Sequence, residues 1–440
     1  MRHPFVGVLI LVLLVGSACT SGHIGVGDGD ADGDTDADGD GDGDADGDGD
    51  GDGDGDTDGD SDADGDGDGD GDADGDGDGD GDVDGDADAD ADSDEPPSPC
   101  GDPSVVPAFV HASWNPILTP RPAVSAHGSD NIYAPDVIRV RDDLCLMWYG
   151  GQGSDGHDRI FLATSTDCHH WHHWPDDAAP AAVLDNGGAN HVNDPSVVAV
   201  DGTYYMYYTE AATGEDDRVH VATSPDGVTW ARAGMVLDVG PAGSWDSFKV
   251  GRPAVLYIGG QFLLWYDGND GTHRHVGLAT SPDGFTFERH PDNPLFLNAG
   301  AVDVDVVGGT YVMLREAGDG TYSATSRDGV VWCDQGRLIG LSGQPFDQYG
   351  QVTPFIMSLS GGFDALLYGG ASDSCWCHNR IALLLPAGID APADPNAGCD
   401  GCTSRNCTED CRGAGFGVEG YCAHPGSTDP GVCCACVPLT

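Results

Sequence analysis

Apolar and polar positions follow one another in the same order five times between residues 133 and 370. Each copy consists of an apolar strand, a tight turn, and an aromatic-rich strand that ends in small or acidic residues. The copies are YAPDVIRVRDDLCLMWYGG (133–151), VNDPSVVAVDGTYYMYYTE (192–210), VGRPAVLYIGGQFLLWYDG (250–268), AVDVDVVGGTYVMLREAG (301–318) and VTPFIMSLSGGFDALLYGG (352–370). Repeats about 50 to 60 residues apart and made only of strands and turns are typical of a β-propeller. The sequence therefore predicts an all-β fold, a five-bladed β-propeller.

A second pattern follows the first four hairpins and predicts the outer strands of each blade. RIFLATSTDCHHW, RVHVATSPDGVTW, HVGLATSPDGFTF and TYSATSRDGVVW each place a turn before a terminal aromatic residue. Asp-Gly pairs suit a turn with a positive φ angle. We expect the aromatic residues to pack between blades; a role as sugar-stacking platforms is the alternative. They are Trp171, Trp230, Phe287 and Trp332.

The fifth copy has no outer strand after HNRIALLLP (378–386). The segment SWNPILTP (113–120), ahead of the first copy, resembles an unpaired fourth strand. We therefore expect the N-terminal segment to complete the last blade and close the ring, which removes exposed strand edges. Cys100 would then lie near the fifth blade with Cys375 and Cys377, and a disulfide among these three cysteines is our hypothesis.

Both ends of the chain differ in composition from the repeats. Residues 1–19 form an export signal in which an apolar run and small residues precede Cys19, as at the lipidation site of bacterial lipoproteins; secretion with a disulfide-bonded Cys19 is the alternative. We assign residues 20–99 to a disordered linker and 100–390 to the propeller. Residues 391–440 hold eight of the 15 cysteines and predict a disulfide-stapled module, with zinc binding less favoured.

The linker dominates the charge of the chain. Residues 28–95 hold 35 of its 76 acidic residues and none of its 17 Lys and Arg. With almost no large apolar side chains to bury, this Asp/Gly-rich tract is expected to be a disordered tether. Its D-x-D-x-D-G stretches also open an EF-hand loop, so weak Ca²⁺ binding is the alternative. So acidic a chain excludes nucleic acid as a partner.

Polar residues gather at the open ends of the five hairpins. Because the first strand of a blade starts near the axis on one face and the second returns to that face, we expect these ends to line one pocket. In the second copy, this places His191, Asn193 and Asp194 across from Glu210. The candidates are Asp130, Asn131 and Asp136 in the first copy; His191, Asn193, Asp194 and Glu210 in the second; Asp246, Lys249, Arg252 and Asp267 in the third; Asp303, Asp305 and Glu316 in the fourth; and Gln348 and Gln351 in the fifth.

Several carboxyl groups at an axial cleft can cleave a glycosidic bond. One protonates the leaving oxygen, while another activates water or attacks carbon. Burial and crowding raise the pKa of a carboxyl group, so that it stays protonated near neutral pH. For any single Asp or Asn, turn capping is the alternative. We interpret the whole cluster as a ligand site.

These residues resemble the five-bladed β-propeller glycosidases, the superfamily of glycoside hydrolase families 32, 43, 62, 68 and 130. The resemblance spans residues 113–386 and is most specific at Asn193-Asp194-Pro195 and, as in family 130, at GTYYMYYTEA and WDSFKVGRPAVLYIGGQFLLWYDG. It implies an axial pocket for a terminal sugar. It also implies an acidic base or nucleophile from blade one, an assisting Asp from blade two and a Glu acid from blade three.

The match is incomplete at three positions. Ala134 stands where the family has its blade-one Asp, and Asp136 follows the proline instead. Arg252 stands where the family has its blade-three Glu. Ser196 replaces the Arg that helps to hold phosphate in family 130, which argues against a phosphorylase.

Two hypotheses follow for the function. The first is a surface-tethered glycoside hydrolase that acts on terminal sugars of an extracellular glycan, with Asp136 as base or nucleophile, Asp194 as orienting group and Glu210 or Glu316 as acid. The second is a non-catalytic, carbohydrate-binding or adhesive propeller lipoprotein. The substrate-binding candidates are Asp130, Asn131, His191, Asn193, Asp246, Lys249, Arg252, Asp267, Asp303 and Gln351.

For either function we expect an exported monomer, held by a lipid on Cys19 at the surface of a bacterial outer membrane. Neither hypothesis requires a cofactor. A weakly held Ca²⁺ in the linker or on the propeller axis stays open.

Overall fold

The computed structural model describes residues 98–389 apart from 213, 215 and 377, and the backbone of four short strands between 400 and 438. This part of the chain contains strands and three short 3₁₀ turns, and no helix in it is long and apolar enough to cross a membrane. The predicted export signal, Cys19 and the Asp/Gly-rich tract lie outside the described residues. Their assignment, and that of the domain limits, stays a prediction.

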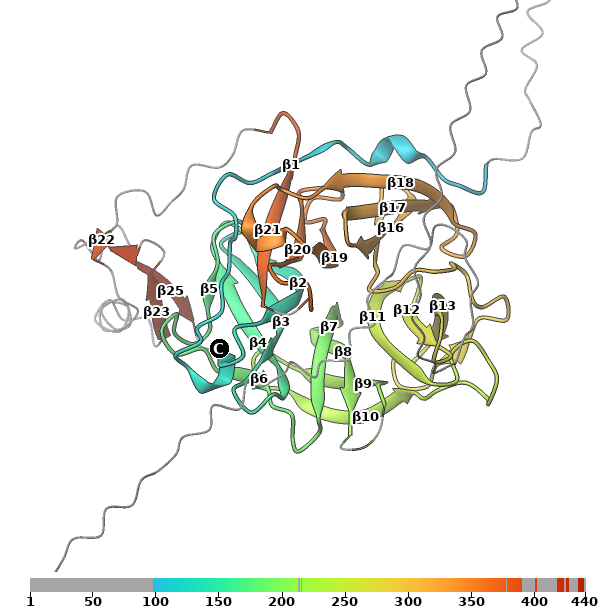
Figure 1. Cartoon of the computed structure of the whole chain (residues 1–440), viewed down its shortest axis with the longest axis horizontal. Helices are drawn as coiled ribbons and strands as arrows, with labels where there is room; N and C mark the ends of the chain where they lie inside the picture. Colours follow the sequence, from blue (N-terminus) through green and yellow to red (C-terminus); the bar gives the residue numbers. More distant parts are fainter. Residues whose placement is uncertain are drawn as a thin grey trace, which may run out of the picture. The chain divides into compact units, whose positions relative to one another are not determined.

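Twenty of the strands between residues 109 and 386 form five groups of four around a common centre (Figure 1). In Figure 1, β2, β7, β11 and β19 lie nearest that centre. Antiparallel neighbours within each group confirm the predicted all-β propeller, and the five groups correspond to the five sequence copies. A single residue pairing between β16 and β19 joins the fourth and fifth groups into one sheet.

The bounds of the strands, group by group, are as follows. The first group is β2 (Ile132–Arg141), β3 (Leu144–Gln152), β4 (Asp158–Ser165) and β5 (His172–His173), with β6 (Ala182–Leu184) added on β4. The second is β7 (His191–Val200), β8 (Thr203–Ala211), β9 (Arg218–Ser224) and β10 (Ala231–Leu237). The third is β11 (Lys249–Ile258), β12 (Gln261–Asn269), β13 (Arg274–Ser281) and β14 (Glu288–Arg289). The fourth is β15 (Asp303–Val307), β16 (Thr310–Ala317), β17 (Gly320–Ser326) and β18 (Cys333–Gly340). The fifth is β19 (Gly350–Met357), β20 (Ala365–Ala371), β21 (Asn379–Pro386) and β1 (Phe109–His111).

The hairpin turns follow the local sequence. Asp201 and Gly202, between β7 and β8, have φ angles of 50° and 78°, the left-handed pair that a two-residue hairpin turn requires. The aromatic second strands are buried between blades. Trp148 and Trp265, for example, have no exposed surface. The hydrophobic core therefore lies between neighbouring blades, where each sheet covers a face of the next.

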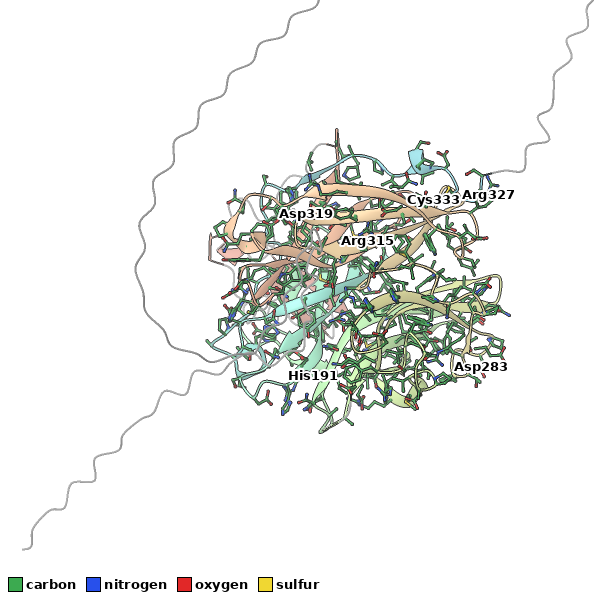
Figure 2. All side chains as sticks on the ribbon, turned by 45° about the vertical axis from the view of Figure 1, so that its right-hand side comes forward. His191, Asp283, Arg315, Asp319, Arg327 and Cys333 are labelled. Carbon is green, nitrogen blue, oxygen red and sulfur yellow. A yellow bond between two sulfur atoms is a disulfide. The ribbon has the colours of Figure 1, made fainter. Side chains whose placement is uncertain are left out.

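The Ser-x-Asp turns between the third and fourth strands connect neighbouring blades. In each turn the serine hydroxyl donates to the aspartate at 2.8 to 3.1 Å, as at Asp283 between β13 and β14 (Figure 2). An aromatic side chain from the preceding blade then donates to the carbonyl oxygen of the turn glycine. These bonds are Trp148 Nε1 to Gly227 at 2.8 Å, Tyr207 Oη to Gly284 at 2.9 Å and Trp265 Nε1 to Gly329 at 3.0 Å.

The aromatic residue that ends each turn has the expected packing role. Trp230 contacts Trp148 with ring centroids 5.9 Å apart, and Phe287 contacts Tyr207 at 5.5 Å. Trp332 contacts Trp265 at 6.3 Å. Each pair joins one blade to the next, which favours interblade packing over sugar stacking.

The N-terminal segment completes the fifth group, as expected, although its strand lies a few residues earlier than predicted. β1 pairs with β21, with Phe109 opposite Pro386. The predicted segment 113–120 continues along β21 with irregular backbone, in which Leu118 forms a single bridge to Ile381. Closure of the ring therefore uses both pieces.

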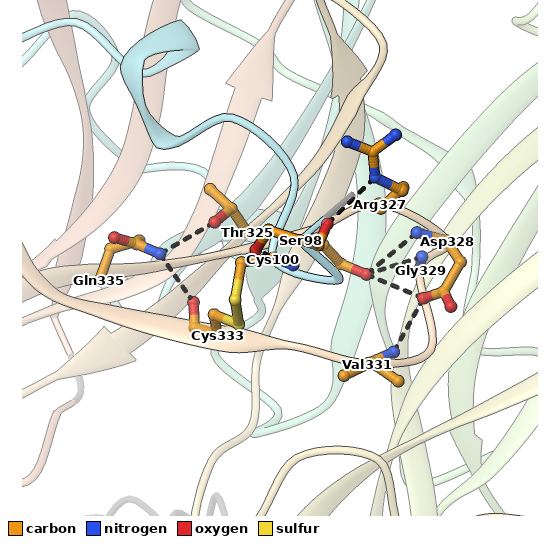
Figure 3. The surroundings of a disulfide bond; sticks show 10 residues. Ser98, Cys100, Thr325, Arg327, Asp328, Gly329, Val331, Cys333 and Gln335 are labelled. Carbon is orange, nitrogen blue, oxygen red and sulfur yellow. Dashed lines mark hydrogen bonds between the residues drawn. A yellow bond between two sulfur atoms is a disulfide. The ribbon is translucent and has the colours of Figure 1, made fainter. Parts of the chain in front are cut away.

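The predicted position of Cys100 is wrong. Cys100 forms a disulfide with Cys333 on β18 of the fourth group, and Cys375 is disulfide-bonded separately (Figure 3). Residues 98–102 run along the edge of the fourth group, so Cys100 lies next to β18. Arg327 donates its backbone N–H to Pro99 at 2.9 Å there. The segment enters the fifth group only afterwards.

A second disulfide links Cys145 on β3 to Cys168 in the turn after β4. In the Cys-rich tail, β22 (Asp400–Gly401) pairs with β24 (Pro425–Gly426), and β23 (Val418–Cys422) pairs with β25 (Cys434–Pro438). The cysteine pairing predicted for this tail lies outside the described residues.

Candidate functional site

A left-handed residue near the start of each inner strand shapes the centre of the propeller. Its φ angle lies between 45° and 52° in all five blades, whereas non-glycine residues rarely have positive φ. In four blades the pairing register shifts by one residue at this point, which makes it a β-bulge. The five residues are Ala134, Asp194, Arg252, Ala301 and Thr353, and proline follows all but Ala301.

The bulges surround a depression at the centre. Each blade lines it with the left-handed residue and the next one or two residues, so the lining repeats around the ring. Its charged members are Asp136, Asp194, Arg252 and Asp303. A second cavity continues along the inner strands and shares Asp136, Ser196, Asp303 and Phe355 with the first.

Asp194 occupies the left-handed position of the second blade. Burial raises the pKa of its carboxyl to about 7, although the charge of Arg252 and a hydrogen bond from Thr209 oppose the shift. Its Oδ2 lies 3.9 Å from Nε of Arg252. Asp194 is therefore a buried carboxyl group that exchanges a proton near neutral pH, as the sequence analysis expected of one member of the cluster.

Asp303 and Asp136 lie two positions after the left-handed residues of their blades. Burial raises the pKa of Asp303 to about 7, and its Oδ2 accepts the N–H of Ile356 at 2.6 Å. Burial also raises the pKa of Asp136 well above its usual range, helped by the charge of Asp303. Oδ2 of Asp136 accepts the N–H of Val197 at 3.2 Å, whereas its buried Oδ1 has no hydrogen-bond partner among the described residues.

Both carboxyl groups thus combine an interblade hydrogen bond with a place on the axis. Ser196, at the equivalent position of the second blade, makes the same kind of bond to the N–H of Val255 at 3.0 Å. One oxygen of Asp136 and one of Asp303 thus have a structural role, because they bind an N–H group of the next blade. Contacts between the described residues thus account for Oδ2 of Asp136 but leave its buried Oδ1 without a hydrogen-bond partner.

Asp267 and Glu316 belong to an ion-pair network beside the depression and do not line it. Arg274 lies between them, 3.5 Å from Oδ2 of Asp267 and 2.6 Å from Oε1 of Glu316. Glu316 also accepts the N–H of Thr353 at 3.2 Å, and Asp267 accepts that of Ala301 at 2.9 Å. Their carboxylates therefore tie the third and fourth blades to the next, which does not favour Glu316 as the acid.

Glu210 also lies away from the depression, and the predicted meeting of its side chain with His191, Asn193 and Asp194 is wrong. Glu210 pairs with Arg232 of β10, and its Oε2 lies 3.8 Å from Nδ1 of His220. The strand pairing places it opposite Val192, with its side chain directed toward the outer strands. The alternation of side chains along β8 explains this placement.

The other predicted binding residues contact protein partners around the rim. Oδ1 of Asn131 accepts from the N–H of Asn379 at 2.9 Å, and Oε1 of Gln351 accepts from Thr321 at 2.7 Å, so both amides connect strands. The remaining contacts are Asp130 with Arg380 at 2.7 Å, His191 with Asp158 at 2.5 Å, Asn193 with Tyr133 Oη at 3.0 Å, Asp246 with Arg289 at 2.7 Å and Lys249 with Asp216 at 3.5 Å. None of these residues lines the depression.

Arg274, Asp158 and Thr209 were not predicted. Arg274 and Asp158 begin third strands, whereas the candidates came from the first two strands of each blade, and Thr209 was passed over for its acidic neighbour Glu210. One signal was present: an arginine stands within the first two residues of the third strand in four blades, as Arg159, Arg218, Arg274 and Arg380. The described residues contain no group of three or more His, Cys, Asp or Glu side chains that could hold a metal ion. Calcium on the axis stays a prediction.

The fold and the inner ring define a β-propeller with acidic residues on its axis, and comparison with known proteins agrees with this class. The family model described as beta-1,4-mannooligosaccharide phosphorylase, glycoside hydrolase family 130, matches residues 119–240. This segment covers the first two blades, and it includes Asp136 and Asp194. The match confirms the resemblance to the propeller glycosidase superfamily.

Two curated relatives and one solved structure extend the comparison. An uncharacterized protein of Mycobacterium tuberculosis is 34% identical over 141 residues, which cover 30% of this chain and 45% of that protein. A probable arabinan endo-1,5-alpha-L-arabinosidase B of Aspergillus fumigatus is 33% identical over 126 residues, 27% of this chain and 31% of that protein. The chain thus matches less than half the length of these relatives.

The solved structure is a family 117 glycoside hydrolase of the marine bacterium Zobellia galactanivorans. It superposes with a TM-score of 0.51 and 17% identity, over 66% of this chain and 94% of that one. At this identity the likeness concerns the fold. The chain is therefore glycoside hydrolase-like in sequence and propeller-like in structure.

Proposed function

We propose that the protein is a glycoside hydrolase that cleaves terminal sugars from an extracellular glycan at the axial depression. The observation that supports it best is the set of three buried carboxyl groups, Asp136, Asp194 and Asp303, from three blades in one depression. A pKa of about 7 for Asp194 and Asp303 suits proton transfer near neutral pH. The match to glycoside hydrolase family 130 over this part of the chain adds support.

In the proposed reaction, one protonated carboxyl group donates its proton to the leaving oxygen as the bond to the anomeric carbon breaks. An ionised carboxylate takes a proton from the water that attacks that carbon, which balances the step. We assign proton donation to Asp136, because its pKa lies well above the usual range, and activation of water to Asp303, which is partly ionised near its pKa of about 7. Asp194, next to Arg252, would orient the sugar and adjust the protonation of Asp136 and Asp303. This assignment replaces Glu210 and Glu316, which lie outside the depression.

A specific observation favours the second candidate, a non-catalytic carbohydrate-binding propeller. In the family that the chain resembles, acidic groups stand at the positions that correspond to Ala134, Asp194 and Arg252. Here Ala134 and Arg252 occupy two of these positions, so that only Asp194 provides a carboxyl group there. Asp136 and Asp303 lie deeper along the axis and would have to do the chemistry.

The tether completes the proposal. A lipid on Cys19 would hold the chain at a bacterial surface, with the Asp/Gly-rich tract as a spacer, and the propeller would act as a monomer without a required cofactor. Support comes from the apolar run before Cys19 and from the composition of the tract. Palmitate labelling of the expressed protein and of Cys19→Ser tests the anchor, because only the parent should incorporate lipid.

Hydrolysis of aryl glycosides and polysaccharides by the full mature chain tests the activity. We expect sugar release by the parent and loss of at least about 100-fold in Asp194→Asn, the range typical of a group that acts on proton transfer. Asp319→Asn is the matched control, because Asp319 pairs with Arg337 away from the depression. Glycan binding without turnover, weakened by the same Asp194→Asn change, would support the second candidate instead.

A further inference from the structure

Arg252 is the only basic residue among those that line the axial depression. Its φ angle of 45° places it at the left-handed position of the third blade, and its backbone N–H donates to Oγ1 of Thr209 at 2.8 Å. The side chain is 20% exposed. The bulge thus holds a largely buried guanidinium at the mouth of the depression.

The guanidinium has five N–H donors, and the described protein groups use few of them. Its one hydrogen bond, from Nη1 to Oδ2 of Asp267, is 3.5 Å long, and Oδ2 of Asp194 lies 3.9 Å from Nε. Both distances exceed those of a strong charged hydrogen bond. Asp267 is also engaged elsewhere, because its two oxygens accept the N–H of Ala301 at 2.9 and 3.0 Å.

Other arginines of the propeller are bound more closely. Arg274 lies 2.6 Å from Glu316, Arg380 lies 2.7 Å from Asp130, and Arg289 lies 2.7 Å from Asp246. A guanidinium in a structural ion pair therefore reaches hydrogen-bond distance in this protein. Among the described residues, the guanidinium of Arg252 makes only the long contact of 3.5 Å to Asp267, although two carboxyl groups are near, and so most of its donors remain available to a ligand.

The charge of the depression changes with the protonation of its carboxyl groups. Burial holds the pKa of Asp194 and Asp303 at about 7, and that of Asp136 well above its usual range. Below pH 7 these three groups are mostly neutral, whereas an arginine stays charged. The charged members of the lining then carry a net positive charge.

We propose that the axial depression binds a sugar with an anionic substituent, the carboxylate of a uronic acid or a sulfate ester, through the guanidinium of Arg252. This inference rests on the proposed function, because it names the substrate class of the same site. The planar guanidinium matches such an anion with two parallel hydrogen bonds.

The affinity for the anion falls as pH rises through about 7, because Asp194 and Asp303 then lose their protons and repel it. The groups that face Asp194 are Arg252 of β11, Thr209 of β8, Asp158 of β4 and Asp217 before β9. Those that face Asp303 are Asp305 of its own strand, Asp136 of β2 and the N–H of Ile356. Of these, only Arg252 is a cation.

The test is an NMR titration of the full mature chain at pH 6 with galacturonate, glucuronate, galactose 6-sulfate and the neutral sugars galactose and glucose. We expect the anionic sugars to bind at least about tenfold more tightly than the neutral ones. Arg252→Gln removes this preference. Arg337→Gln leaves it unchanged, because Arg337 is half exposed and pairs with Asp319 at 2.8 Å on β18. Comparison of the two uronates with galactose 6-sulfate shows whether the site prefers a carboxylate or a sulfate ester.

Equal binding of anionic and neutral sugars, or an anion preference that survives in Arg252→Gln, would overturn the inference. So would the absence of binding by every sugar. Hydrolysis of neutral glycans that depends on Asp194 would leave the proposed function standing while the inference fails. If Arg252→Gln does not fold by circular dichroism, Arg252→Lys replaces it. Lysine keeps the charge but loses the two-pronged contact, so we expect a reduced preference for uronate.

Discussion

Nε of Arg252 lies 3.9 Å from Oδ2 of Asp194, so that the left-handed residues of two neighbouring blades form a loose ion pair at the mouth of the axial depression. In a regular strand, successive side chains point to opposite faces of the sheet. The β-bulges at Asp194 and Arg252 change this order and turn both side chains toward the axis. The pair also controls protonation: burial raises the pKa of Asp194, and the charge of Arg252 holds it at about 7.

Removal of the cation should therefore raise the pKa of Asp194 further. We expect Arg252→Gln to move the titration midpoint of this carboxyl upward from about 7 by about one pH unit, the lower end of the effect of a nearby charge. Carbon-13 NMR of labelled aspartate measures the midpoint, with Arg337→Gln as control. An unchanged midpoint would show that the two groups do not interact.

The position of the carboxyl groups predicts which of them take part in the reaction. Asp303→Asn should lower kcat by at least about 100-fold, whereas Glu210→Gln should keep kcat within about twofold, because Glu210 pairs with Arg232 outside the depression. Kinetics on any substrate from the hydrolysis screen check both. A large loss in Glu210→Gln with an intact fold would return Glu210 to the role that the sequence suggested.

Interblade packing at the Ser-x-Asp turns predicts a stability difference between two glycines. A Cβ at Gly227 would lie 2.9 Å from the ring of Trp148, whereas a Cβ at Gly202 would meet nothing within 4 Å. Both have φ near 75°, so alanine costs the same backbone strain at each. We expect Gly227→Ala to destabilise the protein by about 1–3 kcal/mol more than Gly202→Ala in urea denaturation. Equal losses would mean that Trp148 moves away without cost.

Two buried histidines predict a loss of stability in acid. Burial lowers the pKa of His127 to about 3 and that of His173 to about 4, below the value of about 6.5 in an unfolded chain. Below pH 6.5 the unfolded chain thus binds protons that the folded chain does not, and the free energy of unfolding falls toward pH 4. Asp194 and Asp303 act in the opposite sense, because their raised pKa stabilises the folded chain below about pH 4, and this contribution is lost toward pH 7.

The comparison that isolates the histidines is His173→Gln against the parent, in urea denaturation at pH 7 and pH 5. We expect the parent to lose more stability between these two pH values than the variant does. A drop of the same size in both proteins would assign the acid sensitivity to other groups.

The Cys100–Cys333 disulfide joins residues 233 positions apart, whereas Cys145–Cys168 spans 23. Because a crosslink restricts the unfolded chain more when its loop is longer, loss of the first should cost about 2 kcal/mol more than loss of the second. The double serine variants, compared by urea denaturation under the same oxidising conditions, measure this. A larger loss for Cys145 and Cys168 would show that local packing in the first blade outweighs chain entropy.

The hairpin and turn patterns were sufficient to predict the all-β propeller, its five repeats and its closure by the N-terminal segment. Those features depend on residues that are close in the chain. The Asp201-Gly202 pair favours a two-residue hairpin turn, and alternating aromatic residues predict the buried second strand of a blade. Cys100 was predicted on the wrong blade, because the local sequence does not indicate that the irregular N-terminal segment contacts the fourth group before it pairs with the fifth.

The site was predicted less completely than the fold. Asp136, Asp194, Arg252 and Asp303 lie on the axis as expected, but Glu210 and Glu316 do not. Residue type and position near a strand end could not separate these groups, because a strand directs successive side chains to opposite faces and a bulge reverses that order.

The sequence by itself determined the strands, the turns and the set of polar residues at one end of the blades, because these follow from short-range pattern and backbone preference. Only the tertiary structure decided which of those residues face the axis and which bind the next blade. That choice depends on the bulge at Asp194 and Arg252 and on partners far apart in the chain, such as Thr209 for Arg252 and Ile356 for Asp303.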